Sequence, residues 1–319
     1  MQNTFCTIIT ADYYPYAVAL YKSLRNFNEQ ATLHVLIADN KPIGEELPFY
    51  PGIKLVTTQE LSKNTTIAEL YGRYAHINMD FFRWAAKPLF LLHLLKKDYD
   101  RVIFLDCDIF FFNDCNFLIT ELDSAGILLT PHWRTPYPLI DETGFVSLFT
   151  KGIFNAGFIG ASQRGIPALR WWAEACHFKM GEVPTMGIHD DQKYLDAMPV
   201  LFETVKIVRH KGCNISSWNV IECQRKKING NLLINGEYPI IFIHFSEILA
   251  KEILRGHDPL LLPYLITYKT VFEEDGTKLS TFMNELDTHL QPGILKKIKW
   301  KLKLRVRIKR FLYELAQSL

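Results

Sequence analysis

The chain has 319 residues, of which 48% are hydrophobic and 22% are charged, which is the composition of an ordinary soluble globular protein. Its length fits one large α/β domain with extensions or two smaller domains, and no stretch has the roughly 18 uncharged apolar residues that a membrane span needs. The net charge of +2 conceals an acidic body, because residues 296–319 carry nine Lys or Arg and one Glu, or +8, which leaves −6 for the rest.

The start of the chain and its cysteines bear on where the protein is found. The N-terminal residues include neither a basic segment nor a separate apolar one, so we expect no secretory signal. The six cysteines form no Cys-x-x-Cys pair and no spacing typical of a disulfide framework. We therefore expect reduced thiols and a cytoplasmic protein.

The first 112 residues alternate between β-rich and helix-like segments. A polar break at Asp12 separates the first predicted strand from the first helix, and Pro88 kinks or divides a second helix over 79–97. The predicted strands cover residues 4–10, 31–39, 52–58 and 102–112. This β-α-β-β-α-β order, with continuous apolar strands, predicts an α/β fold with a mainly parallel sheet and helices on both faces.

The second half of the chain adds further elements of the same kinds. We predict strands over 126–132, 154–162 and 238–247, a helix over 166–178, and a helix over 188–198 that begins with capping aspartates. A boundary near residue 257 is expected to divide a main domain, residues 1–257, from a helical extension over 258–295 and a basic tail over 296–319.

Two aspartates, Asp106 and Asp108, interrupt the apolar run "VIFLDCDIFFF", where unpaired buried carboxylates would cost several kcal/mol each. In a strand, residues two apart face the same side, so both carboxylates point to one place and Cys107 points the other way. Ligands of such sheets gather beyond the carboxyl ends of the strands, and Asp12 follows another of these ends. The pattern indicates a Mg²⁺ or Mn²⁺ site completed by phosphates; the alternative is a pair of solvated strand-end caps.

Four short motifs occur in order within residues 4–255: "FLDCD", "FNAGF", "DDQKYL" and "IHFS". With them, the chain resembles nucleotide-sugar-dependent glycosyltransferases of the GT-A fold, and most of all glycosyltransferase family 8. The resemblance implies a Rossmann-like sheet and a divalent cation, Mn²⁺ or Mg²⁺, held by Asp106, Asp108 and His244 against the diphosphate of the donor. A lone histidine at a strand end is otherwise more often structural, so the role of His244 depends on the resemblance.

The same resemblance implies how a UDP-linked donor binds. Ala11 and Asp12 would line the uracil pocket, with Tyr13 or Tyr14 stacking on the base. A helix-entry turn capped by Asp12 is the alternative. Arg83 matches a helix arginine that contacts the sugar and phosphate of the donor.

Three further positions correspond to donor contacts in the family. Lys87 lies four residues after Arg83 on the same predicted helical face, and an exposed basic stripe is the alternative for both. Asn155 matches an asparagine near the sugar hydroxyls. Lys251 is the counterpart of a phosphate-binding lysine, in a segment where Glu247 replaces the glycine of the family.

The segment around residue 191 bears on the stereochemistry. Asp191 matches an aspartate that recognises a sugar hydroxyl, and Gln192 a glutamine beneath the anomeric carbon. Because glutamine cannot act as a general base, the resemblance implies retention, with the leaving phosphate deprotonating the acceptor. An inverting enzyme would need a carboxylate base, which Asp190 or Asp191 could supply.

Two further features are left open by the resemblance. Lys193 replaces the acidic residue that the family often has at this position. The loop 210–219 forms either a wall of the site or a packed turn.

Basic and apolar residues alternate with period two in the tail, which favours an extended amphipathic ribbon. Such a segment suits an anionic lipid surface, at about 1 kcal/mol for each basic residue near it. Nucleic acid is the rival partner, but no recognition motif is present and the body is acidic. We expect a cytoplasmic protein that is peripheral on the inner face of the cell membrane and has no nucleic-acid partner.

The resulting hypothesis is a metal-dependent glycosyltransferase that moves a hexose from a UDP-sugar to a glycolipid or lipid-linked glycan, such as a lipopolysaccharide or capsule precursor. A haloacid-dehalogenase-type phosphatase would follow the aspartate pair with Gly-Thr, whereas Ile109 and Phe110 follow here. A nucleotidyltransferase would need a glycine-rich loop after the first strand, which "TADYYPY" lacks. A scaffold of the same fold without activity is the non-enzymatic alternative.

Overall fold

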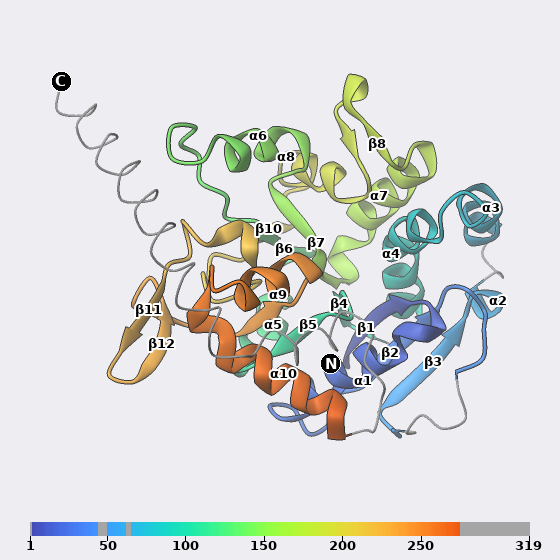
Figure 1. Cartoon of the computed structure of the whole chain (residues 1–319). Helices are drawn as coiled ribbons and strands as arrows, with labels where there is room; N and C mark the ends of the chain where they lie inside the picture. The colour runs from blue at the N-terminus through green and yellow to red at the C-terminus, as the bar shows by residue number, and fades with distance from the viewer. Residues whose placement is uncertain (1, 44–49, 62–64, 98, 275–319) are drawn as a thin grey trace.

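A seven-stranded sheet forms the centre of the computed structural model, which describes residues 2–43, 50–61, 65–97 and 99–274 (Figure 1). The strand order is β10-β6-β7-β4-β1-β2-β3. Every strand runs parallel to its neighbours except β7, which is antiparallel to both β4 and β6. The predicted α/β fold with a mainly parallel sheet is confirmed. The bounds are β1 Asn3–Ile9, β2 Leu33–Ile37, β3 Ile53–Thr57, β4 Arg101–Leu105, β6 Ile127–Pro131, β7 Phe154–Ser162 and β10 Val205–Ile207.

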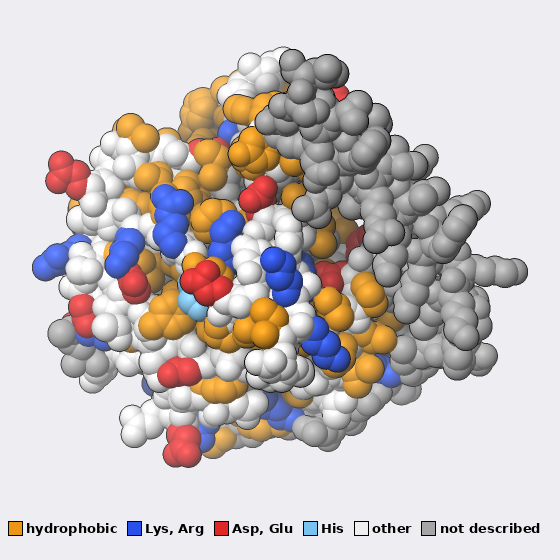
Figure 2. All heavy atoms as spheres, turned by 90° about the vertical axis from the view of Figure 1, so that its left-hand side faces the viewer, with side chains coloured by type: hydrophobic (Ala, Val, Ile, Leu, Met, Phe, Trp, Pro, Cys, Tyr) orange, Lys and Arg blue, Asp and Glu red, His pale blue; other side chains and the backbone are white. Residues whose placement is uncertain are grey.

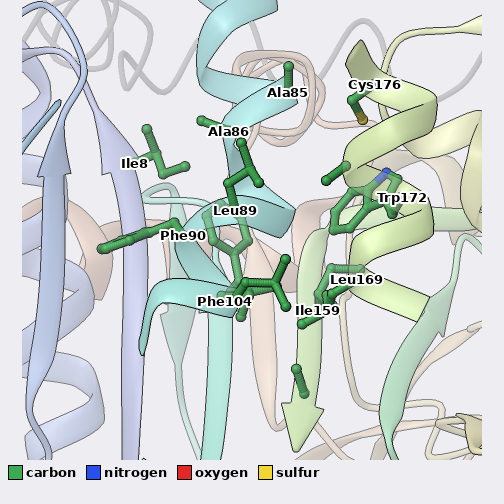
Figure 3. Close-up of a cluster of buried hydrophobic side chains, with 14 of the residues drawn as sticks. Ile8, Ala85, Ala86, Leu89, Phe90, Phe104, Ile159, Leu169, Trp172 and Cys176 are labelled. Carbon is green, nitrogen blue, oxygen red and sulfur yellow. The ribbon is translucent and has the colours of Figure 1, made fainter. Parts of the chain in front are cut away.

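Helices cover both faces of this sheet because successive strand residues point to opposite sides. In β1, Cys6 and Ile8 contribute to one buried cluster, and Phe5 and Ile9 contribute to the other. The first cluster lies beneath α3 (Thr65–Tyr74), α4 (Met79–Lys96) and α7 (Ile166–Phe178), as Figure 3 shows for part of it. The second lies beneath α1 (Tyr14–Arg25) and α5 (Asn116–Glu121).

A third buried cluster joins the end of the described chain to the centre of the molecule. Strand β5 (Ile109–Phe111) pairs with β14 (Phe242–His244), and helices α9 (Glu247–Leu254) and α10 (Leu262–Glu274) pack against them. The ring of Tyr268, on α10, stacks on Phe245 at a centroid distance of 4.5 Å. The predicted helix after residue 257 is therefore present up to residue 274, while the division into domains stays a prediction.

Smaller elements extend from this core. They include α2 (Thr58–Leu61), α6 (Glu142–Thr150), α8 (Met198–Leu201), the pair β8 (Glu182–Val183) and β9 (Ile188–His189), and the antiparallel sheet of β11 (Arg225–Ile228), β12 (Asn231–Ile234) and β13 (Tyr238–Pro239). Figure 2 views the side that carries the β11–β12 hairpin and shows basic, acidic and hydrophobic side chains interspersed on it. In the part of the chain that the structure describes, no helix is long and apolar enough to span a bilayer.

Some of the predicted elements differ from the structure. Helix α4 continues through Pro88 instead of dividing there, and the proline is buried among the apolar residues of the helix. The predicted strand over 238–247 is two short strands, β13 and β14, which belong to different sheets. All six cysteines are free, as expected. The tail over 296–319 lies outside the described residues.

Candidate functional site

The Asp-x-Asp pair lies in a turn and not on an extended strand. Strand β4 ends at Leu105, the backbone N–H of Ile109 donates to the carbonyl of Asp106 at 3.1 Å, and β5 follows. The alternation argument for the two carboxylates was therefore wrong in its geometry, since residues 106–108 are not extended. The turn is fixed on its other side by the Asp106 N–H, which donates to the carbonyl of Gly157 at 2.8 Å.

Strand pairing brings His244 to this turn from far along the chain. β14 runs antiparallel to β5, with His244 opposite Ile109, and the N–H of Phe245 donates to the carbonyl of Asp108 at 2.8 Å. The imidazole Nε2 of His244 lies 3.0 Å from Oδ1 of Asp108. Asp106, Asp108 and His244 each offer one ligand atom, and these atoms all lie within 4.8 Å of one another.

His244 and Asp108 attract each other, and each shifts the pKa of the other. Burial disfavours the charged imidazole, but the carboxylates of Asp108 and Asp106 together outweigh it and raise the pKa of His244. Burial likewise opposes ionisation of Asp108, yet His244 holds the pKa of that carboxyl below its usual value. Two carboxylates with one imidazole form a donor set that suits Mn²⁺ or Mg²⁺, so these residues fit the cation that the sequence led us to expect.

Gly157, in the "FNAGF" motif on β7, makes room for this cluster. A Cβ atom at this position would lie 2.6 Å from Cε1 of His244, 2.7 Å from Oδ1 of Asn155 and 2.8 Å from Oδ2 of Asp106. Real Cβ atoms do not approach other heavy atoms this closely. Only glycine therefore lets the backbone of β7 pass beneath the three side chains.

The buried ammonium group of Lys87 balances the negative charge of two acidic residues. Lys87, on α4, is 3% exposed, and its Nζ lies 3.4 Å from Asp106 and 3.2 Å from Asp191, and donates to the carbonyl of Ala156 at 3.1 Å. Burial disfavours its charge, but the two carboxylates outweigh this and raise the pKa of Lys87, so it stays an ammonium. An exposed basic stripe is thus wrong for Lys87. Burial raises the pKa of Asp191 to about 6, against the opposing effect of Lys87.

A network of amides lies next to the cluster. Oδ1 of Asn155 accepts hydrogen bonds from the N–H of Gly157 at 3.1 Å and from Nδ2 of Asn214 at 3.0 Å. Nδ2 of Asn155 donates to Nε2 of His132 at 3.4 Å, and Nδ1 of His132 donates to the carbonyl of Gly152 at 3.0 Å. Burial lowers the pKa of His132 to about 3, so its ring is neutral and acts as both donor and acceptor.

The predicted uridine-binding segment follows β1. Tyr13 is 42% exposed, and the guanidinium of Arg83 lies 5.7 Å from its ring centroid. Tyr14 is only 3% exposed and packs in the core, so Tyr13 alone of the two is free to stack on a base. The carboxylate of Asp12 accepts from the hydroxyl of Thr10.

Sequence reasoning missed Asp39, which lies beside this segment. Its Oδ1 accepts a hydrogen bond from the backbone N–H of Ala11 at 3.1 Å. Asp39 follows β2, which is parallel to β1, so the carboxyl ends of the two strands meet at one edge of the sheet. The position of Asp39 after a predicted strand was the signal that could have identified it.

Other predicted site residues have different partners. Nε2 of Gln192 donates to the carbonyl of Lys151 at 2.9 Å. Asp190 has a left-handed backbone, with φ +50°, and its carboxylate lies 3.9 Å from the imidazole of His189. Lys251 forms an ion pair with Glu247 one turn earlier on α9.

The predicted capping role of Asp191 is wrong. Its side chain makes no cap hydrogen bond and turns to Lys87 instead, and the segment that follows is a 3-10 helix over Gln192–Ala197 before α8. The carbonyl of Asp191 accepts from the indole N–H of Trp172 at 2.9 Å, which anchors the backbone to α7.

Two proteins of Bacillus subtilis are similar to the chain in sequence. No family model matches the chain. It is 27% identical over 268 residues to the uncharacterized protein YfnF of Bacillus subtilis (strain 168), covering 81% of this chain and 86% of the relative. It is 29% identical over 251 residues to the uncharacterized protein YfnD of the same organism, covering 76% of each.

Solved structures decide the fold. The galactosyltransferase LgtC, crystallised in complex with donor and acceptor sugar analogs, matches 89% of this chain over 100% of its own, with a TM-score of 0.52 at 14% identity. The fold is that of a GT-A glycosyltransferase. In this GT-A fold, the carboxyl ends of β1 and β4, together with β14, carry Asp12, Asp106, Asp108 and His244, and the helix α4 adds Arg83 and Lys87.

Proposed function

We propose that this protein is a divalent-metal-dependent glycosyltransferase of the family 8 type that transfers a hexose from a UDP-linked donor. The observation that carries the proposal is the convergence of Asp106, Asp108 and His244, with ligand atoms within 4.8 Å of one another in a GT-A fold. LgtC, which has the same fold, was crystallised with donor and acceptor sugar analogs. That complex supports a sugar donor and a glycan acceptor for this chain.

The three ligands would hold Mn²⁺ or Mg²⁺. When bound, the cation neutralises the negative charge that develops on the departing diphosphate. The protein's own part is to fix the ligands: the buried ammonium of Lys87 holds Asp106 through an ion pair, and the β5–β14 pairing holds Asp108 and His244 in register. Lys251, on α9, is the proposed further contact to phosphate.

Exposed groups near the end of β1 suit the nucleoside. The ring of Tyr13 offers an aromatic face, and Ala11 and Asp12 complete the proposed uracil pocket. Arg83 packs against Tyr13 and forms an ion pair with Asp80 at 3.1 Å. Its guanidinium is therefore positioned to contact the donor's phosphate or sugar.

The surroundings of the carboxylates favour a retaining reaction. Asp191 is 4% exposed and is paired with Lys87, so we assign it, like Asn155, to binding a sugar hydroxyl and not to proton abstraction. Asp190, the other candidate base, lies near His189. The amide of Gln192 cannot accept a proton as a general base, so the leaving phosphate takes the acceptor's proton on the same face. An inverting reaction with Asp190 or Asp191 as base is the alternative.

The proposed acceptor is a glycolipid or lipid-linked glycan at the inner face of the cell membrane, such as a lipopolysaccharide or capsule precursor. Support comes from the composition of residues 296–319, whose +8 charge and apolar residues suit an anionic bilayer. No step of the proposed chemistry depends on this segment, so acceptor and membrane contact are tested separately.

The deciding experiment replaces Asp108 by Asn. We expect Asp108→Asn to bring Mn²⁺-dependent transfer or hydrolysis, assayed over a panel of nucleotide sugars, down to background while the melting temperature changes little. Asp114→Asn is the matched control, because Asp114 is exposed and its side-chain oxygen, which caps the N–H of Asn116, is kept by asparagine. Full activity in Asp108→Asn would refute the metal role. A wild-type chain with no activity on any donor, despite binding Mn²⁺, would favour the inactive scaffold.

A further inference from the structure

Trp218 contacts two imidazoles at the candidate site, and the proposed chemistry gives it no part. It belongs to a short 3-10 helix, Ser217–Asn219, in the loop between β10 and β11. Its ring is 5.3 Å from that of His244 at an interplanar angle of 89°, and 5.3 Å from that of His132 at 83°. Both are edge-to-face contacts at the separation that such aromatic pairs prefer.

The ring of His244 lacks its usual second support. A histidine that binds a metal through one nitrogen normally donates its other N–H to a carbonyl or carboxylate, which fixes the tautomer and the orientation of the ring. Nε2 of His244 faces Asp108, but its Nδ1 is buried and has no hydrogen-bond partner among the described residues. The edge-to-face contact with Trp218 is side-chain packing that can hold this ring opposite the carboxylates.

The loop that carries Trp218 is attached directly to the strand of His244. The hydroxyl of Ser216 donates to the carbonyl of His244 at 3.0 Å, and the N–H of His244 donates to the carbonyl of Ile215 at 2.9 Å. Ser216 and Asn219 also form a reciprocal capping box around Trp218. The indole and the imidazole are thus carried by backbone segments that cannot move independently.

A buried ion pair strengthens this attachment. Arg225, on β11, donates to the carbonyl of Ser216 at 2.8 Å, and its Nε lies 2.9 Å from the carboxylate of Asp258. The side chains of Arg225 and Asp258 are 3% and 9% exposed. Losing either partner would leave a buried charge uncompensated, so the loop is held firmly in one conformation.

The second ring in contact with Trp218 is itself fixed. His132 is 2% exposed, and it is hydrogen-bonded through both nitrogens, to Gly152 and to Asn155. The indole therefore contacts both a fixed neutral imidazole and the candidate metal ligand. Displacing His244 away from the cluster would disturb its contact with this indole.

We propose that Trp218 is a positioning residue for the metal site, which holds the His244 imidazole toward the cation by edge-to-face packing in place of a second hydrogen bond. This inference rests on the proposed function, because it assigns Trp218 to the same metal centre. It predicts that the aromatic ring at position 218, and not only its volume, sets the affinity for Mn²⁺.

Two substitutions test whether the aromatic ring of Trp218 or only its volume matters, because Phe and Leu are similar in size. Trp218→Phe keeps an aromatic ring, and we expect its Mn²⁺ affinity, measured by titration calorimetry with Mn²⁺ alone and with UDP present, to stay within about threefold of the wild type. Trp218→Leu removes the ring, and we expect a loss of about tenfold, the lower end of what second supports of metal ligands contribute. Melting temperatures identify any variant that fails to fold.

Fluorescence tests whether Mn²⁺ binds beside the indole, as the proposal requires. Paramagnetic Mn²⁺ bound at His244 should quench the adjacent indole, and this part of the quenching should vanish in Trp218→Phe. Trp171→Phe is the matched control, because Trp171 is a partly buried indole on α7 that packs against Phe202. It should leave both the affinity and this quenching unchanged.

Two results would overturn the inference in different ways. If wild type and Trp218→Leu bind Mn²⁺ equally tightly, Trp218 does not position His244, while the metal centre itself stands. If the wild-type protein binds no Mn²⁺ with or without UDP, the metal centre of the proposed function fails and the role of Trp218 fails with it.

Discussion

Single residues around β7 and α4 decide whether the ligands can converge. Lys87 has almost no solvent contact and pairs with Asp106 and Asp191, and removing one partner of a buried pair such as Lys87–Asp191 costs about 3–5 kcal/mol. Helical spacing alone could not distinguish this buried lysine from the alternative, a lysine in an exposed basic stripe. Spacing gives the face of a helix, but not what that face packs against.

Gly157 provides the sharpest test at this scale. A methyl group there would collide with His244, Asn155 and Asp106, so we expect Gly157→Ala to weaken Mn²⁺ binding at least about tenfold as measured by calorimetry. Gly72→Ala is the control: a Cβ at Gly72 meets nothing within 4 Å, and the change in helix α3 should stabilise the protein by up to about 1 kcal/mol. Unchanged Mn²⁺ affinity in Gly157→Ala would contradict the proposed position of the cation.

Among the elements, the short strands β5 and β14 matter most for the site, and they show what the sequence could and could not predict. The strands of the parallel sheet were predicted because they are continuous apolar runs, and the helices over 79–97 and 166–178 because they are long segments rich in apolar residues. The pairing of residues 109–111 with 242–244 joins segments far apart in the chain, and no local pattern specifies such a partner. The order of the four family motifs, and not periodicity, placed His244 beside the aspartates before the structure did.

A buried histidine on β2 makes the stability of the fold depend on pH, which the sequence did not indicate. His34, on β2, is 7% exposed, and its Nε2 lies 2.9 Å from the hydroxyl of Tyr99. Burial, with help from the positive charges of Lys54 and Lys97, lowers the pKa of His34 to about 4. Since the unfolded chain takes up this proton near pH 6.5, the unfolded state binds more protons between pH 6.5 and 4.

Stability should therefore fall as the pH is lowered through that window, by on the order of 3 kcal/mol from this residue, and should not depend on it above pH 7. Urea unfolding of wild type and His34→Gln between pH 4.5 and 7 measures the effect, and the variant should show a shallower slope. His76→Gln, at an exposed histidine, should keep the slope of the wild type. Identical slopes for wild type and His34→Gln would show that the histidine is not held neutral.

At the scale of the whole molecule, the sequence divides its charge between an acidic body of −6 and a basic segment of +8 at residues 296–319. The face seen in Figure 2 mixes basic, acidic and hydrophobic side chains, so this face of the body offers no large basic surface of its own. The nine Lys and Arg of that segment would attract it to an anionic bilayer, at about 1 kcal/mol for each one near the lipid.

Removing residues 296–319 should thus sharply reduce co-sedimentation with phosphatidylserine vesicles at low salt, while transfer to a soluble acceptor persists. A full-length variant with the nine Lys and Arg changed to Gln keeps the apolar residues and isolates the contribution of charge. Binding by the wild type should also weaken as salt is raised from 0.05 to about 0.5 M, because screening shortens the reach of each charge. If the truncated protein still sediments with anionic vesicles as the wild type does, the membrane contact lies on the body, and the donor chemistry at Asp106, Asp108 and His244 is unaffected by that result.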